Sequence, residues 1–135
     1  MNKSQKMATV RAKSAYTMRR RQTEEAYRQY RKTAPSQVCP LCDGRKILKR
    51  WKYWMIVENH YPYDLVAGVS HLLITTGHSF SKPGRWLSGI ELYWKILPAI
   101  RREGYYTIIL ENLVRRKTVP GHAHWHLLVD DNLSG

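Results

Sequence analysis

Three histidines alternate with apolar residues near the end of the chain: His122, His124 and His126, followed by Leu-Leu-Val. Because side chains of a β-strand point alternately to its two faces, this spacing predicts that the three imidazoles share one face. Half of the six histidines therefore fall within five residues. Adjacent imidazolium groups repel one another, so the cluster indicates a functional site. A neutral imidazole is also an effective nucleophile near pH 7.

Two cysteines form a second group with chemical potential. Cys39 and Cys42 lie in the segment S-Q-V-C-P-L-C-D-G, residues 36–44, which reads as a compact turn. A Cys-x-x-C turn lets two thiolates converge on one metal ion. Taken alone, the pair is also compatible with small buried thiols or with redox-active thiols.

Strands and one main helix are expected to position these groups. Short runs rich in β-branched and aromatic residues predict strands at residues 47–51, 54–58, 69–75, 105–110 and 123–129. A helix is predicted before Gly104, with an internal bend at Pro98. Its core face is predicted from apolar residues three and four apart, namely Leu87, Ile90, Tyr93, Leu97 and Ile100, widened by Leu92 and Ile96. The order helix, strands, helix, strands predicts an α+β fold with an antiparallel sheet.

The chain is small and strongly basic. It has 135 residues, with 23 Lys and Arg against 10 Asp and Glu, for a formal charge of +13. This size fits one ordinary domain, and two cysteines cannot build a disulfide scaffold. No apolar stretch approaches the roughly 18 residues of a membrane span, and the basic N-terminus lacks the apolar region of a secretory signal. We therefore expect a cytoplasmic protein without a membrane partner.

The positive charge is concentrated in an N-terminal arm, residues 1–35, which holds ten basic and two acidic residues. A helix is predicted from about residue 14 to residue 32, ended by Pro35. Two interpretations are equally supported. The helix could be solvated and dock Tyr27 and Tyr30 on the body, residues 36–135. Alternatively, it could be a cationic arm that binds phosphates.

The pattern His122 to Leu128 resembles the signature of the histidine triad (HIT) superfamily, His-φ-His-φ-His-φ-φ. Three other segments are similar to that family: Trp54-Met-Ile-Val-Glu-Asn-His-Tyr-Pro-Tyr63, Ser70-His-Leu-Leu-Ile-Thr-Thr-Gly-His78, and Gly104-Tyr-Tyr-Thr-Ile-Ile-Leu-Glu-Asn112. The resemblance spans roughly residues 37–130. It implies a HIT-like antiparallel sheet with one main core helix, preceded here by the basic N-terminal helix.

The resemblance also implies an activity and a set of residues. HIT proteins are nucleotidyl hydrolases and transferases that act at the α-phosphate of nucleotides, such as dinucleoside polyphosphates and nucleoside phosphoramidates. By position, His124 would attack phosphorus and become a nucleotidyl-histidine, with its other ring nitrogen donating to a backbone carbonyl. His126 would contact phosphate oxygens or the leaving group. Asn59, Asn112 and Thr118 would bind substrate.

The metal-containing branch of the family, which includes galactose-1-phosphate uridylyltransferase-like enzymes, implies a zinc site. The four ligands would be Cys39, Cys42, His78 and His122. A closed Cys2His2 set is typical of structural zinc. This ion would join the cysteine turn to the strand that carries His124.

Departures from the family pattern leave other functions open. The usual Gln-Ser before the triad is absent, and Pro120 removes a backbone donor from that segment. These features favour a non-catalytic nucleotide- or nucleic-acid-binding module as one alternative. A second alternative is an enzyme directed to nucleic acid, similar to aprataxin in removing 5′-adenylate, because residues 1–35 and Arg115–Lys117 are basic. A homodimer is also compatible with the sequence.

Overall fold

The computed structural model of the protein describes residues 18–34, 39, 41–42, 44–77, 82–111 and 122–130. Its elements are, in order, α2 (Arg21–Thr33), β1 (Ile47–Arg50), β2 (Trp54–Glu58), β3 (Val69–Thr75), α3 (Lys82–Ile90), η1 (Glu91–Ile96), α4 (Leu97–Glu103), β4 (Ile108–Leu110) and β5 (His124–Val129). The five strands form one sheet of order β1-β2-β3-β5-β4. Every neighbouring pair is antiparallel, so the predicted α+β class is confirmed.

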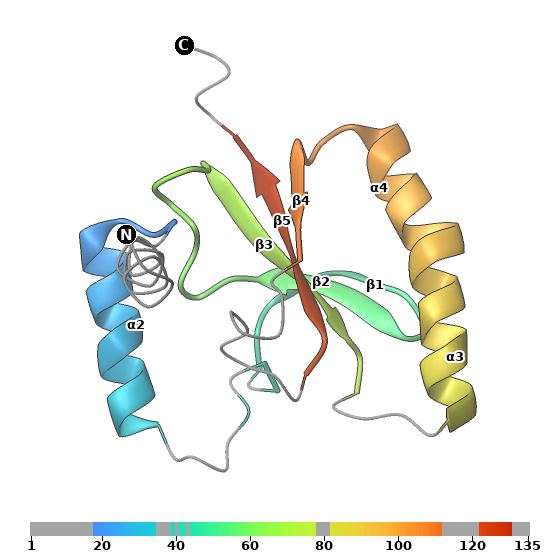
Figure 1. The fold of residues 1–135 in the computed structure, drawn as a ribbon, viewed down its shortest axis with the longest axis horizontal. Helices are drawn as coiled ribbons and strands as arrows, with labels where there is room; N and C mark the ends of the chain where they lie inside the picture. The colour runs from blue at the N-terminus through green and yellow to red at the C-terminus, as the bar shows by residue number, and fades with distance from the viewer. Residues whose placement is uncertain are drawn as a thin grey trace, which may run out of the picture.

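Helices cover the sheet from two sides. In Figure 1 the continuous helix formed by α3, η1 and α4 lies on one side of the strands, and α2 lies on the other. Both faces of the sheet are apolar, as two separate clusters show. The first joins strand and helix residues, namely Trp54, Ile56, Leu73, Leu92, Ile96, Leu97, Ile100 and Leu127. The second lies on the opposite face and contains Leu41, Val57, Leu72 and Ile74.

Two hydrogen bonds attach the main helix to β2 and to the turn before it. The indole Nε1 of Trp54 donates to the Ser88 carbonyl at 2.8 Å. The Tyr53 backbone N–H donates to the Glu91 carboxylate, also at 2.8 Å. The helix ends at Gly104, whose φ of 68° is the left-handed conformation that glycine adopts without steric penalty. This end was predicted from the sequence.

A π-helical turn directly precedes the segment of this helix that contains Pro98. Proline has no N–H to donate to the carbonyl of Trp94, four residues earlier. The six residues of η1 form a π-helical turn, and the N–H of Leu97 bonds to the carbonyl of Leu92, five residues earlier. The extra residue in the turn rotates the preceding segment relative to the sheet.

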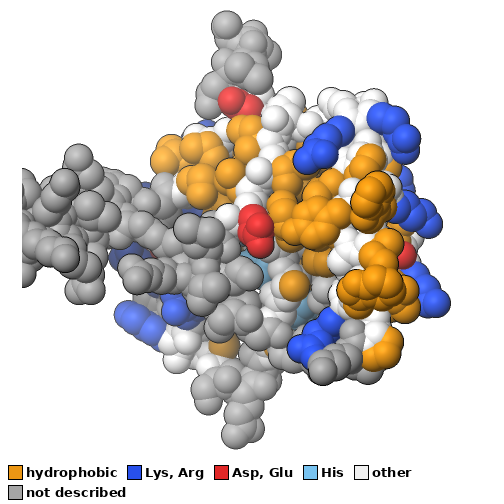
Figure 2. Space-filling model, turned by 45° about the vertical axis from the view of Figure 1, so that its right-hand side comes forward, with side chains coloured by type: hydrophobic (Ala, Val, Ile, Leu, Met, Phe, Trp, Pro, Cys, Tyr) orange, Lys and Arg blue, Asp and Glu red, His pale blue; other side chains and the backbone are white. Residues whose placement is uncertain are grey.

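The predicted core face of this helix is therefore partly wrong. Ser88, Leu92, Ile96, Leu97 and Ile100 are buried, whereas Leu87, Ile90 and Tyr93 are exposed. Among the described large hydrophobic side chains, Trp86 and Trp94 are the most exposed, at 71% and 81%. Figure 2, turned toward this side of the molecule, shows hydrophobic side chains on the surface with Lys and Arg around them.

The helix α2 begins later than the sequence predicts. Residues 18–20 are not helical, and Arg20 is extended, with φ −61° and ψ 155°. The cause is a set of contacts with the loop between β2 and β3. The Leu65 N–H donates to the Met18 carbonyl, and the Arg20 N–H donates to the Asp64 carboxylate at 2.6 Å. Asp64 thereby holds Arg20, the residue just before α2, from a position 44 residues away.

The strand predicted at residues 105–110 is shorter than expected, because pairing with β5 begins only at Ile108. Among the described residues, no helix combines the length and the apolar character that crossing a bilayer requires.

Candidate functional site

The two histidines of β5 lie on the same face of the sheet, as their spacing predicts. His124 is opposite Ile74 of β3, and His126 is opposite Leu72. Leu72 and Ile74 belong to the apolar cluster on the side away from α3–α4. Both imidazoles are buried, at 5% and 4% exposure. The central position of β5, between β3 and β4, holds them rigidly.

The ring of His124 has a defined tautomer. Its Nδ1 lies 2.9 Å from the carbonyl oxygen of His122. A carbonyl oxygen can only accept a hydrogen bond, so Nδ1 carries the proton and donates it. In the neutral imidazole Nε2 then presents a lone pair. The hydrogen bond to a backbone carbonyl, expected from the family resemblance, is present.

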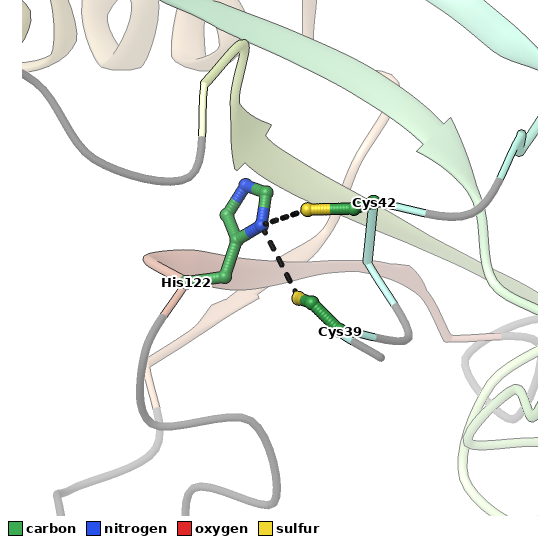
Figure 3. Close-up of side chains that lie close together, drawn as sticks. All are labelled: Cys39, Cys42 and His122. Atoms are coloured by element: carbon green, nitrogen blue, oxygen red, sulfur yellow. Dashed lines mark hydrogen bonds between the residues drawn. The ribbon is translucent and has the colours of Figure 1, made fainter. Parts of the chain in front are cut away.

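Cys39, Cys42 and His122 converge on one point, as Figure 3 shows. The His122 Nδ1 lies 3.6 Å from the sulfur of Cys39 and 3.5 Å from the sulfur of Cys42. All three donor atoms lie within 4.8 Å of one another. The cysteines are 83 and 80 positions away from His122 in sequence, so the fold itself assembles this cluster. It could hold a metal ion.

A second contact fixes His122 in the orientation of a metal ligand. Its Nε2 lies 3.0 Å from the Thr75 carbonyl oxygen, to which it must donate. The Nδ1 lone pair therefore faces the two sulfurs. Metal-bound histidines commonly donate their other ring N–H to such an acceptor. The donor set, its geometry and this supporting hydrogen bond all fit a bound metal.

His126 contacts Tyr63, which comes from the loop between β2 and β3. The two rings are stacked, with centroids 4.3 Å apart, and the tyrosine hydroxyl lies 3.1 Å from His126 Nε2. Burial lowers the pKa of His126 to about 3, and the nearby charges of His124 and Arg19 act in the same direction. His126 is therefore neutral at physiological pH.

His124 and His126 line a pocket of about 390 Å³, measured with the part that opens to solvent. Asn59 also lines it, and its side-chain oxygen accepts a hydrogen bond from the Tyr61 N–H at 3.1 Å. The structure thus brings Asn59 to the same pocket as the two histidines. The remaining walls come from the N-terminal segment, the cysteine turn and the sheet, with Arg19, Tyr27, Tyr30, Leu41, Arg45, Tyr61 and Leu72.

Several residues expected at the site lie outside the described residues. These are His78, the fourth proposed metal ligand, Asn112 and Thr118, proposed to bind substrate, and the basic segment Arg115–Lys117. Their predicted roles stay predictions.

Three residues at the site were not singled out from the sequence. Arg19 and Arg45 line the pocket, and Tyr63 stacks on His126. Arg19 stands in a run of three arginines, and nothing in the run distinguishes the one that reaches the pocket. Tyr63 could have been identified, because it lies in the aromatic turn Tyr61-Pro62-Tyr63 that closely follows the candidate site residue Asn59.

Comparisons of the chain with models of protein families, with curated proteins and with solved structures find no match.

Proposed function

We propose that the protein is a HIT-type nucleotidyl hydrolase or transferase that acts at the α-phosphate of a nucleotide through a nucleotidyl-histidine on His124. One observation carries this proposal. His124 donates from Nδ1 to the His122 carbonyl, and it lines a pocket together with a second buried histidine. A fixed tautomer with a nucleophilic Nε2 is what such a covalent mechanism requires. The residue pattern His122 to Leu128 supports the same family.

In the first step, the Nε2 lone pair of His124 forms a bond to phosphorus, and the bond from phosphorus to the leaving oxygen or nitrogen breaks. The leaving group departs with that electron pair and takes a proton from solvent. In the second step, water or another acceptor attacks phosphorus, loses a proton to solvent, and releases Nε2. The bond between Nδ1–H and the His122 carbonyl is maintained, so it stabilises the positive charge on the imidazole.

The neighbouring groups have supporting roles. His126 is neutral, so it binds a phosphate oxygen or the leaving group by hydrogen bonding and does not act as a second cation. Its contact with Tyr63 fixes the orientation of its ring. Asn59 borders the same pocket and is suited to bind the ribose. Asn112 and Thr118 are assigned to the phosphate or leaving group on the family resemblance alone.

We propose further that the metal is zinc and that its role is structural. With typical bond lengths, a tetrahedral zinc site places a ligand nitrogen and sulfur about 3.6 Å apart. The two distances from His122 Nδ1 to sulfur, 3.5 and 3.6 Å, agree with this value. His78 is the proposed fourth ligand. When bound, the ion would hold Cys39 and Cys42 against His122, two residues before the nucleophile.

The test is turnover of a substrate panel by the full-length protein. The panel contains a dinucleoside tetraphosphate, a nucleoside phosphoramidate and 5′-adenylated DNA, and mass spectrometry detects both mononucleotide and nucleotidyl-protein adduct. His124→Ala removes the nucleophile. The matched control is His71→Ala, because His71 lies on β3 but bonds to Tyr106 on the opposite face of the sheet.

The proposal requires mononucleotide release that His71→Ala retains and His124→Ala loses by at least about 1,000-fold, the scale seen when a catalytic nucleophile is removed. Absence of product and adduct from the folded, metal-loaded wild type would contradict it. That result would favour the non-catalytic binding module.

The second candidate is an enzyme directed to nucleic acid. The helix α2 favours it, because Arg21, Arg28, Arg31 and Lys32 are all exposed. Deleting the arm is not a clean test, since residues of α2 also line the pocket. Glutamine at these four exposed positions is the better variant. It should weaken turnover of adenylated DNA selectively, with a reduced dependence on salt.

A further inference from the structure

The N-terminal segment forms one wall of the histidine pocket. Arg19, Tyr27 and Tyr30 all line it. Tyr27 and Tyr30 pack on Tyr61 of the β2–β3 loop, with ring centroids 5.0 and 5.5 Å apart. The basic arm is thus docked on the body from residue 18 onward, and its first described arginine lines the same pocket as the candidate nucleophile.

Arg19 is held in place by several contacts. Its Nε donates to the Tyr61 carbonyl at 2.7 Å, and its Nη1 lies 3.4 Å from the Glu24 carboxylate. The guanidinium carbon lies 4.4 Å from the ring centroid of Tyr27 and 4.8 Å from that of Tyr63. Aromatic rings that contact the guanidinium limit its rotation, and its N–H groups lie in its own plane. The side chain is therefore preorganised to bind an anion.

The described residues that line the pocket carry positive charge. Among the described residues that line the pocket, two are arginines, Arg19 and Arg45, and none is a carboxylate. The charge of Arg19 also contributes to the lowered pKa of His126, after burial and the charge of His124. An anion placed there gains from both arginines, whereas another cation would be repelled.

We propose that Arg19 forms an anion subsite beside the histidines, which binds a non-reacting phosphate oxygen of the nucleotide, so that the arm is part of the substrate site. This inference rests on the proposed nucleotide-directed function. Arginine is suited to bind phosphate because its planar guanidinium group can donate two parallel hydrogen bonds to phosphate oxygens. The exposed arginines of α2, by contrast, are not among the described residues that line this pocket.

Asp64 positions this subsite. Its carboxylate accepts hydrogen bonds from the Arg20 N–H and from the Thr23 hydroxyl. Its backbone carbonyl also accepts a bond from Arg20 Nε at 3.1 Å. The residue next to Arg19 is thus tied directly to the loop that carries Tyr61 and Tyr63.

The experiment measures binding of AMP and of inorganic phosphate to the full-length, metal-loaded protein by calorimetric titration. Three variants are compared with the wild type: Arg19→Gln, Arg19→Lys and Arg21→Gln. Arg21 is the matched control, because it is exposed and its change removes the same charge from the same arm. Near-UV circular dichroism, which reports tyrosine packing, verifies that the arm stays docked.

We expect Arg19→Gln to raise the Kd for AMP by roughly 10- to 100-fold, as for loss of one charge-assisted hydrogen bond. Arg19→Lys should give a smaller loss, because it keeps the charge without the planar guanidinium group. Arg21→Gln should change the Kd by less than about 3-fold, as expected for a screened surface charge.

Other results would overturn the inference. Equal losses for Arg19→Gln and Arg21→Gln would mean that only the overall charge matters. An unchanged Kd for Arg19→Gln, together with turnover that still needs His124, would refute the subsite but keep the proposed function. A loss that appears only when the tyrosine signal collapses, and that a double change of Tyr27 and Tyr30 to Ala reproduces, would assign Arg19 to packing alone. A wild-type protein that binds neither AMP nor phosphate would overturn the subsite, whereas only the absence of His124-dependent turnover would overturn the proposed function.

Discussion

The Nδ1 atom of His124 lies 2.9 Å from the carbonyl oxygen of His122, the residue whose own Nδ1 faces the sulfurs of Cys39 and Cys42. One residue thus provides a metal-ligand nitrogen and the backbone acceptor that orients the candidate nucleophile. Any displacement of His122 moves both groups. On the proposed function, this coupling would let a metal ion without a direct chemical role influence the orientation of the candidate nucleophile.

The first prediction concerns the tautomer of His124. Because the His122 carbonyl can only accept, neutral His124 should carry its proton on Nδ1 and leave Nε2 unprotonated. Long-range proton–nitrogen correlation spectra of ¹⁵N-labelled protein distinguish the two ring nitrogens directly, and the spectrum of His124→Ala identifies the signals. A proton on Nε2 in the folded, metal-loaded protein would contradict the assigned nucleophile.

The second prediction concerns the metal. The protein should carry one zinc ion per chain by elemental analysis, and Cys39→Ser or Cys42→Ser should lose it. Metal binding to the folded state alone adds about 2.7 kcal/mol to the free energy of unfolding at a concentration 100 times the Kd. A chelator should therefore lower the Tm of the wild type by several degrees and leave the serine variants unchanged. An equal Tm with and without chelator would exclude a structural role.

The third prediction concerns the pH dependence of stability. The pKa of His126 is lowered from 6.5 to about 3, chiefly by burial. Between these values the unfolded chain binds a proton that the folded chain does not, so stability rises with pH and is lost as the pH falls below about 6.5. His126→Gln should reduce that slope by at most about 1.4 kcal/mol per pH unit. Denaturant unfolding from pH 4.5 to 7.5 measures it, and identical slopes would show that His126 titrates normally.

The sequence predicts the strands of the sheet well because a strand is recognised from residues that are close together in the sequence. The period of two at His124 and His126, and the apolar runs of β2 and β3, each depend on neighbours a few positions away. The bounds of β2 and β3, 54–58 and 69–75, agree with the prediction. The convergence of Cys39, Cys42 and His122 was expected only through the family resemblance, since sequence spacing alone does not bring residues 80 positions apart together.

Features that depend on distant contacts were not predictable. The start of α2 is fixed by Asp64, which shares no local pattern with Arg20. Arg19 lines the pocket because the N-terminal segment is docked on the loop that carries Asp64. The composition therefore identified a basic arm but not which of its arginines lines the pocket. The prediction of the core face of the main helix was partly wrong for a different reason. Pro98 was recognised, but the π-helical turn before it shifts every residue upstream, and no periodicity of 3.6 survives such a shift.

The fourth prediction concerns the attachment of the arm. Burial alone would raise the pKa of Asp64, but hydrogen bonds from Thr23 and Arg20 outweigh that effect and lower it. The stabilising contribution is therefore present above the ordinary pKa of about 3.8 and is lost as the pH falls through the lowered value. Asp64→Asn removes the negative charge and one of the two acceptor oxygens, and should cost about 1 kcal/mol at pH 7, as for loss of one hydrogen bond.

The readout is hydrogen exchange of the α2 amides. Exchange should accelerate in Asp64→Asn at pH 7, while the amides of β3 and β5 keep their protection. Glu25→Gln is the matched control, since Glu25 is exposed and accepts a hydrogen bond from Gln29 of the same helix. If both variants behave alike, Asp64 does not hold the arm.

The fifth prediction tests the rotated helix with a matched pair of leucines. Regular α-helical periodicity would bury Leu87, whereas the π-helical turn buries Leu92 at 3% exposure and leaves Leu87 at 40%. Leu92→Ala removes packing against the sheet and should cost about 2–5 kcal/mol of unfolding free energy. Leu87→Ala should change it by no more than about 0.5 kcal/mol, because surface substitutions have small effects and alanine favours helix. Urea unfolding of the two variants measures both changes in the free energy of unfolding.

The opposite order, with Leu87→Ala the more destabilising, would mean that the helix keeps a regular period of 3.6 through Pro98 and presents its other face to the sheet.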